Sequence, residues 1–257
     1  LSRKKAEFGV GIARMEDRYF QTNIIDFSET KHDESTYSIF GGSIVLEGST
    51  LNARQFATQG SREKMAAQIF TGTEHFRSGI SKVTKGTPEP YKKVQSWLQV
   101  SYQNETYHKV SPKFTLGAYL EAYYSSRNFS NNYTATLMQA GEFTPTAHSK
   151  VTYNEAFRAN QYAGVGTMPI YQLSESFQLR GEFYGFIPIF PIKKDEYGQA
   201  YYGKAFTKFE YLGEISLVFQ LSFGSISAYV NHYSSPSNDW NVGLTLGWQL
   251  FNSRFVE

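Results

Sequence analysis

The chain alternates bulky apolar residues with small or polar ones, and the alternation is clearest near its end. Within Trp240–Phe251 one set of alternate positions is apolar: Val242, Leu244, Leu246, Trp248 and Leu250. The positions between them are small or hydrogen-bonding, as at Gly243 and Thr245. Because successive side chains of a strand point to opposite faces of a sheet, this segment is predicted to be a β-strand. Its two faces suit lipid on one side and a polar lumen on the other.

Similar alternating segments recur along the whole chain, separated by residues that favour turns. We expect strands at about Glu7–Arg14, Tyr19–Phe27, Tyr37–Glu47, Arg62–Thr73, Lys92–Gln103, Phe114–Tyr124, Phe157–Ile170, Phe177–Ile189, Phe209–Leu221, Ile226–Tyr233 and Trp240–Phe251. The expected breaks include Met15–Arg18, a charged turn at Lys31–Ser35 and a longer turn at Gly48–Gly60. No segment predicts a helix. Residues 125–155 lack the alternation, and a long segment of this kind inside a β-meander is usually functional or mobile.

The pattern predicts an all-β fold, an antiparallel transmembrane β-barrel with about twelve strands in a single domain, residues 1–257. Closure into a barrel would leave no free sheet edge and would pair every backbone group within lipid. The alternative is a soluble β-sandwich or a lipocalin-like barrel. Its strands would be shorter and its inner face apolar. Here the small or polar face is the consistent one, which favours the membrane barrel.

Composition changes this picture little. The mean hydropathy is −0.43, and no apolar run approaches the ~20 residues of a transmembrane helix. Membrane barrels also have a low mean hydropathy, because half of each strand faces a polar interior. Aromatic residues make up 17% of the chain, and they favour strands and membrane interfaces. The net charge of +2 gives no indication of nucleic-acid binding, and the absence of cysteine excludes disulfides and thiol chemistry.

No catalytic, cofactor or metal site is expected from the sequence. The Gly-x-Ser-x-Gly motif of a hydrolase nucleophile does not occur. His232 beside Asn231 is the one hint of a Ser–His–Asn site on a barrel wall, and a histidine at the rim or on the membrane face explains it better. The other four histidines do not have the spacing of metal ligands: His32, His75, His108 and His148.

Three pieces of the chain resemble the bacterial surface antigen superfamily of outer-membrane barrels. Ser49–Ser61 is similar to the family's inter-strand turn, with Ala57 where the family has proline. Phe157–Tyr162 lies where the family has a loop motif with a central arginine, and here the arginine alone is matched, as Arg158. The ending Glu214–Phe251 is similar to the last strands of these barrels. This ending, together with Tyr133–Ala140 and Pro145–Lys150, most resembles barrels attached to patatin-like phospholipase domains.

The resemblance implies a barrel of 16 strands with about eight after the turn motif, and eight are predicted here after Gly60. Only about three strands precede it, so we expect a chain truncated at its N-terminus, or a smaller variant of the barrel. The start, Leu1–Lys5, contains neither an initiator methionine nor a signal segment, which fits the mature or C-terminal part of an exported precursor. The family's C-terminal aromatic strand also serves as an assembly signal. Here Phe251 is followed by six further residues.

The resemblance also implies a function and a pair of charged residues. In the family the loop arginine pairs with an acidic residue of the barrel wall, so Arg158 is expected to pair with Glu182. Arg180, Glu210 and Glu214 are expected as further luminal charges, and the alternative is a solvated ladder formed by all five. The implied function is a non-enzymatic barrel in the bacterial outer membrane that anchors, and helps to translocate, a patatin-like partner domain. The alternatives are a passive pore and an assembly factor for other outer-membrane proteins.

Overall fold

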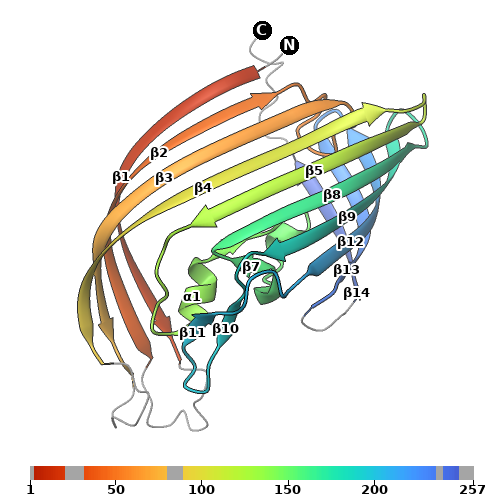
Figure 1. Ribbon diagram of the computed structural model, residues 1–257. Coiled ribbons are helices and arrows are strands. Elements are labelled where there is room, and N and C mark those ends of the chain that lie inside the picture. Colours follow the sequence, from red (N-terminus) through yellow and green to blue (C-terminus); the bar gives the residue numbers. More distant parts are fainter. Residues whose placement is uncertain (1–2, 21–31, 80–88, 236–239, 249–257) are drawn as a thin grey trace.

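The computed structural model describes residues 3–20, 32–79, 89–235 and 240–248, and nearly all of its regular structure is antiparallel β-sheet. Ten strands form one main sheet and pair in chain order (Figure 1). They are β1 (Arg3–Tyr19), β2 (Asp33–Ser49), β3 (Gly60–Arg77), β4 (Tyr91–Lys109), β5 (Phe114–Ser125), β8 (Gln161–Gln172), β9 (Phe177–Pro188), β12 (Glu210–Leu221), β13 (Gly224–Tyr233) and β14 (Trp240–Trp248). The all-β class is therefore confirmed. Among the described residues, β1 and β14 each pair along one side only.

The main sheet curls strongly and has a concave and a convex face (Figure 1). The alternation in the sequence separates these two faces. In β9, Gln178 and Arg180 are 0% and 2% exposed on the concave face, whereas Leu179 and Phe183 are 42% and 48% exposed on the convex face. The expected orientation of the strands is therefore confirmed, with the polar positions buried inside the curl.

The two ends of the sheet differ in their connections. At one end the hairpins β4–β5, β8–β9 and β12–β13 are joined by residues 110–113, 173–176 and 222–223. At the other end the connections are longer, and residues 126–160 and 189–209 are the longest of them. We call these the short-turn end and the long-loop end. Membrane barrels of bacteria show this asymmetry, with short turns in the periplasm and long loops outside the cell.

The first strand differs from the prediction. The expected break at Met15–Arg18 is wrong, because these residues continue β1 and pair with Glu34–Tyr37 of β2. The expected charged turn at Lys31–Ser35 is also wrong in part, since β2 already begins at Asp33. Of the expected strand Tyr19–Phe27, Tyr19 ends β1, and residues 21–27 lie outside the described part of the chain. Within the described residues the main sheet has ten strands, where about twelve strands were expected.

The expectation of no helix is wrong as well. Helix α1 (Tyr133–Gln139) lies on the concave side of the sheet (Figure 1). The side chain of Asn132 caps it by accepting a hydrogen bond from the backbone N–H of Ala135 at 3.1 Å. With seven residues, α1 is too short for the helical periodicity to show in the sequence. Its stability comes from packing, because helices of this length are marginal alone.

Four short strands complete the fold in two separate ribbons. Strands β6 (Gly141–Glu142) and β7 (Arg158–Ala159) pair with each other near α1 (Figure 1). Strands β10 (Ile192–Lys194) and β11 (Ala200–Tyr202) form a hairpin within the connection between β9 and β12. Because Phe157 belongs to a 3₁₀ turn, the strand expected at Phe157–Ile170 begins only at Gln161.

Candidate functional site

Two segments enter the concave side of the sheet from its opposite ends. The first, which we call the inner turn, is the β2–β3 connection at residues 50–59, at the short-turn end. The second, which we call the inner segment, comprises residues 126–160 and enters from the long-loop end. They meet where the rings of Phe56 and His148 lie 6.5 Å apart. Together they cover the concave face over β5, β8, β9, β12 and β13 and form the candidate functional site.

The inner turn has a fixed conformation set by its own residues. The side-chain oxygen of Asn52 accepts hydrogen bonds from the backbone N–H groups of Thr58 and Gln59, at 2.9 and 3.1 Å. Gly60 closes the turn with a φ of +89°, and a Cβ there would lie 2.2 Å from the carbonyl oxygen of Thr50. No L side chain fits at that position. The turn therefore has one fixed conformation, which directs it across the concave face.

The tip of the inner turn is bound by side chains of β9 and β12. Arg180 donates a hydrogen bond to the carbonyl of Ala57 at 2.9 Å. Gln178 and Gln220 donate to the carbonyl of Phe56 at 3.3 and 3.2 Å. Phe56 has a φ of +53°, which is uncommon for a residue with a side chain. The strained tip is thus held by hydrogen bonds from the opposite wall of the sheet.

Arg180 is buried, and its charge is balanced locally. Its Nε lies 3.1 Å from one carboxylate oxygen of Glu182, and the other oxygen accepts a hydrogen bond from the Tyr184 hydroxyl at 3.1 Å. The guanidinium lies 5.6 Å from the ring centre of Phe56 and 5.7 Å from that of Tyr107. A buried charge is costly unless it is paired and hydrogen-bonded, and here both conditions hold.

A second buried group fixes the inner segment to β12 and β13. Nδ1 of His148 lies 2.6 Å from a carboxylate oxygen of Glu214. The other oxygen of Glu214 accepts a hydrogen bond from the Thr146 hydroxyl at 3.3 Å and one from the Asn231 amide at 3.4 Å. The ring of His148 stacks on Tyr229 with 3.7 Å between ring centres. We call Thr146, His148 and Glu214, with these partners, the His148 anchor.

The His148 anchor has the order of groups found in serine hydrolases. Nε2 of His148 lies 3.2 Å from the hydroxyl oxygen of Ser227, so a hydroxyl, an imidazole and a carboxylate stand in line. A nucleophile must also reach a substrate beside groups that stabilise an oxyanion. Ser227 is only 1% exposed, and the ring of His148 is covered by Tyr229. We therefore interpret the group as a structural anchor.

An aromatic cluster fills the space between the inner segment and the wall. Phe143 is buried and contacts five rings of the inner segment and of β5, β8 and β9: Tyr119, Phe157, Tyr162, Tyr184 and Phe186. Gly164 of β8 makes room for it, because a Cβ there would lie 2.1 Å from the Phe143 ring. The cluster supplies the apolar core of the concave side.

Helix α1 contacts the first strands of the sheet through polar side chains. Gln139 donates to Asp17 of β1 at 2.7 Å, and Asn132 donates to Asp33 of β2 at 3.2 Å. Before the helix, the guanidinium of Arg127 lies 4.7 Å from the ring centre of Trp97 in β4. The inner segment thus contacts β1, β2 and β4 on one side of β5, and β12 and β13 on the other side.

The β10–β11 hairpin contacts the same helix from the long-loop end. The backbone N–H of Tyr133 donates to the carbonyl of Gly198 at 3.3 Å, and Lys194 lies 5.8 Å from the centre of the Tyr133 ring. Burial, with smaller effects of Glu155 and Tyr153, raises the pKa of Tyr133 to about 12. The hydroxyl therefore stays neutral over the physiological range.

The expected Arg158–Glu182 pair does not form. Arg158 lies 2.8 Å from Glu142 and donates to the carbonyl of Leu137 at 3.3 Å, both within the inner segment. Glu182 is engaged by its neighbour Arg180. The correction has a geometric cause, because β6 and β7 place Glu142 directly opposite Arg158. Arg158 therefore stabilises the inner segment internally.

The other charges expected in the lumen lie on the concave face. Arg180, Glu210 and Glu214 are all at most 7% exposed. Glu210 pairs with Lys208 at 3.2 Å and accepts a short hydrogen bond from Ser234. These groups are held in specific contacts, in contrast to the alternative of a solvated ladder.

The closing strand has its apolar face outward. Val242, Leu244 and Leu246 are 69–79% exposed on the convex side. Leu250 and the side chain of Trp248, which were assigned to the same face, lie outside the described part of the chain.

Within the described residues, no group of three or more His, Asp or Glu side chains is arranged to hold a metal ion. The same part of the chain contains no helix that is both long enough and apolar enough to cross a membrane.

The sequence missed His148 as a functional residue because its partners come from three other elements. The one available signal was its position in the Pro145–Lys150 stretch of the non-periodic segment.

Comparison with models of known protein families and with curated protein sequences finds no match to this chain. The resemblance to the surface antigen superfamily therefore stays a prediction, and function has to be argued from the geometry.

Proposed function

We propose that this chain is a transmembrane β-barrel of the bacterial outer membrane that acts without enzymatic activity and anchors a partner domain. The observation that carries the proposal is the convex face of the main sheet. Every one of its ten strands exposes at least one large apolar side chain there: Phe8, Phe40, Ile69, Val94, Leu116, Val165, Leu179, Ile215, Val230 and Val242. A water-soluble monomer rarely exposes an apolar surface of this extent, whereas a barrel in lipid requires it.

The dimensions of the strands support the same proposal. The shortest of the ten, β14, has 9 residues, and β1–β4 have 17 to 19. A transmembrane strand needs roughly 9–11 residues. All ten strands therefore have the length to cross a bilayer, and β1–β4 would project beyond it.

The filled concave side favours an anchor over an open channel. The inner turn and the inner segment meet inside the sheet, and both are fixed by buried charged groups. An open porin has a water-filled lumen instead. The partner domain itself is expected from the resemblance, and an interior occupied by the inner turn and the inner segment is consistent with a barrel whose task is attachment.

Heat-modifiable migration on a gel tests the barrel. Folded membrane barrels resist detergent until they are boiled, so the unboiled chain should migrate differently from the boiled one. Identical migration, together with solubility in the absence of detergent, would overturn the membrane assignment and favour the β-sandwich.

Conductance across a planar bilayer separates the anchor from the passive pore. We expect little steady current from the whole chain and a large current from a variant that lacks residues 128–157. A large steady current from the unmodified chain would favour the pore.

A further inference from the structure

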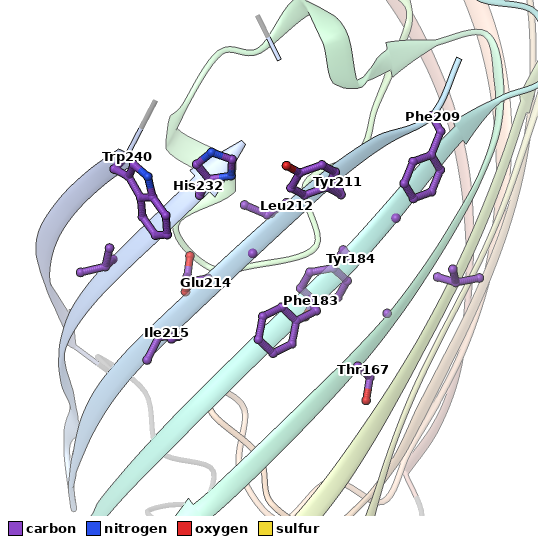
Figure 2. Close-up of a pocket in the computed structure, with 15 residues that line it drawn as sticks. Thr167, Phe183, Tyr184, Phe209, Tyr211, Leu212, Glu214, Ile215, His232 and Trp240 are labelled. Atoms are coloured by element: carbon purple, nitrogen blue, oxygen red, sulfur yellow. The ribbon is translucent and has the colours of Figure 1, made fainter. Parts of the chain in front are cut away.

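A shallow groove of about 610 Å³ lies on the convex face of the sheet, on the side opposite the inner turn and the inner segment (Figure 2). It crosses β8, β9, β12, β13 and β14. Its volume falls in the range of small-ligand sites, although it faces the surroundings of the proposed barrel and not its lumen. The proposed function does not use this groove.

The floor of the groove is formed where outward-facing positions have no side chain. Gly213 lies at its centre, between Phe183 of β9 and His232 of β13, with which it is paired across the sheet. A Cβ at Gly213 would lie 3.6 Å from the nearest atom of Phe183, an ordinary contact distance, so the space above it is open. At Gly185 of β9 the ring of Phe209 covers the backbone, because an added Cβ would lie 2.9 Å from that ring. The groove thus has bare backbone at Gly213, with large side chains on either side.

The lining changes character from one end of the groove to the other. Tyr211, His232 and Trp240 lie together toward the long-loop end, with ring centres 5.9 Å apart for Tyr211–His232 and 4.8 Å apart for His232–Trp240 (Figure 2). Ile215 and Val230 line the other end and are purely apolar. Aromatic residues with a polar atom are enriched at the level of lipid head groups, so the three rings mark the edge of the bilayer.

We propose that this groove binds one hydrocarbon chain of a membrane lipid, with the lipid's head group beside Tyr211, His232 and Trp240. The inference rests on the proposed location in a membrane. A flexible chain fits a narrow apolar strip whose floor is backbone, and an amphipathic ligand fits a site whose polar atoms lie at one end.

The test uses the fluorescence of Trp240 in the detergent-purified full chain. A phosphatidylethanolamine with brominated acyl chains quenches tryptophan on contact, and the Trp240→Phe variant identifies the signal of Trp240 among the three tryptophans. We expect quenching that saturates at one lipid per protein. Gly213→Leu fills the groove and should weaken the binding about tenfold or more.

Gly42→Leu is the matched control. Gly42 also faces outward from a strand, and the nearest atom to an added Cβ is 3.8 Å away, but it lies on β2 outside the groove. This variant should bind the lipid as the unmodified chain does. Equal quenching of Trp240 in the unmodified chain, Gly213→Leu and Gly42→Leu would overturn the inference. Quenching that does not saturate would also overturn it. So would a dimer that Gly213→Leu dissociates, because a second copy would then be the occupant.

The same samples distinguish the two proposals. If all three proteins show heat-modifiable migration but bind the lipid equally, the groove inference alone is wrong. If the unmodified chain shows no heat-modifiable migration, the membrane assignment itself fails.

Discussion

At the scale of single residues, the concave face is organised by buried ionisable groups whose partners come from distant parts of the chain. Glu214 on β12 meets His148, and Arg180 on β9 meets the backbone of the inner turn. Removing one partner of such a group leaves the other desolvated and without its hydrogen bond, which costs more than the contact contributes when it is intact. We therefore expect the fold to be sensitive to substitution of these groups.

His148→Ala should loosen the inner segment. The Glu214 carboxylate would lose its closest partner at 2.6 Å, and we expect the free energy of unfolding to fall by about 2–3 kcal/mol. Limited proteolysis within residues 126–160 is the measurement, with the temperature of the heat-modifiable transition as a second readout. His108→Ala is the control, because His108 lies exposed on β4. Unchanged proteolysis of His148→Ala would argue against an anchor at this site.

Gly164→Ala should destabilise the fold through a steric conflict. The new methyl group would lie 2.1 Å from the Phe143 ring, which is packed among five other rings and cannot easily move. Overpacking of this kind costs about 1–3 kcal/mol. The double variant Gly164→Ala/Phe143→Leu should recover part of the loss in a thermal unfolding measurement. Gly11→Ala, where an added Cβ meets nothing within 4 Å, is the control.

At the scale of elements, the inner segment is a small unit with its own internal contacts. Its two short strands β6 and β7 pair with each other, and the Arg158–Glu142 ion pair lies across them. The carbonyl of Leu137 at the end of α1 accepts a further hydrogen bond from Arg158. Arg158 thus joins the helix to the ribbon, while His148 joins the whole segment to the sheet.

Exchanging the charges of Arg158 and Glu142 tests whether this ion pair stabilises the inner segment internally. Arg158→Glu and Glu142→Arg should each increase proteolysis of the inner segment, and the double exchange should restore part of the protection. The heat-modifiable transition should change little, because no strand of the main sheet contributes to the pair. If Glu182→Gln instead couples to Arg158 in a double-mutant cycle, the original wall-pairing hypothesis would be supported.

At the scale of the whole molecule, the two faces of the sheet are inverted relative to a soluble protein. Charged and polar groups are buried inside the curl, and large apolar side chains cover the outside. In water this arrangement would expose the apolar surface and be unfavourable. In a bilayer it would be the stable one, since lipid would cover the apolar convex face while the inner turn and the inner segment satisfy polar groups of the concave face.

Ile69→Lys distinguishes these two environments. Ile69 lies in the middle of β3 and is 63% exposed on the convex face. In a soluble protein the change would be nearly neutral or would improve solubility. In a barrel a lysine near the bilayer midplane costs about 2–4 kcal/mol, and the folded fraction in lipid vesicles should fall accordingly. Glu63→Lys near the end of the same strand should have a much smaller effect.

The sequence predicted the main sheet well because strand alternation is a local property. The eight strands expected after the turn motif are all present, and β9 and β14 have the faces expected of them. The misplaced break at Met15–Arg18 shows the limit of that reasoning. Two acids and two bases within five residues resemble a turn, but in the fold they extend a long strand beyond the proposed bilayer.

The sequence by itself determined the class of the fold and which side chains face each way, because a period of two residues is fixed by the strand backbone. It also identified Arg180, Glu210 and Glu214 as inward-facing residues. Only the tertiary structure decided what these charges contact. Arg180 binds Ala57 of the inner turn and Glu214 binds His148, and these partners are 123 and 66 positions away along the chain. Contacts of this kind depend on how two irregular segments fold back into the sheet, and no local pattern encodes that path.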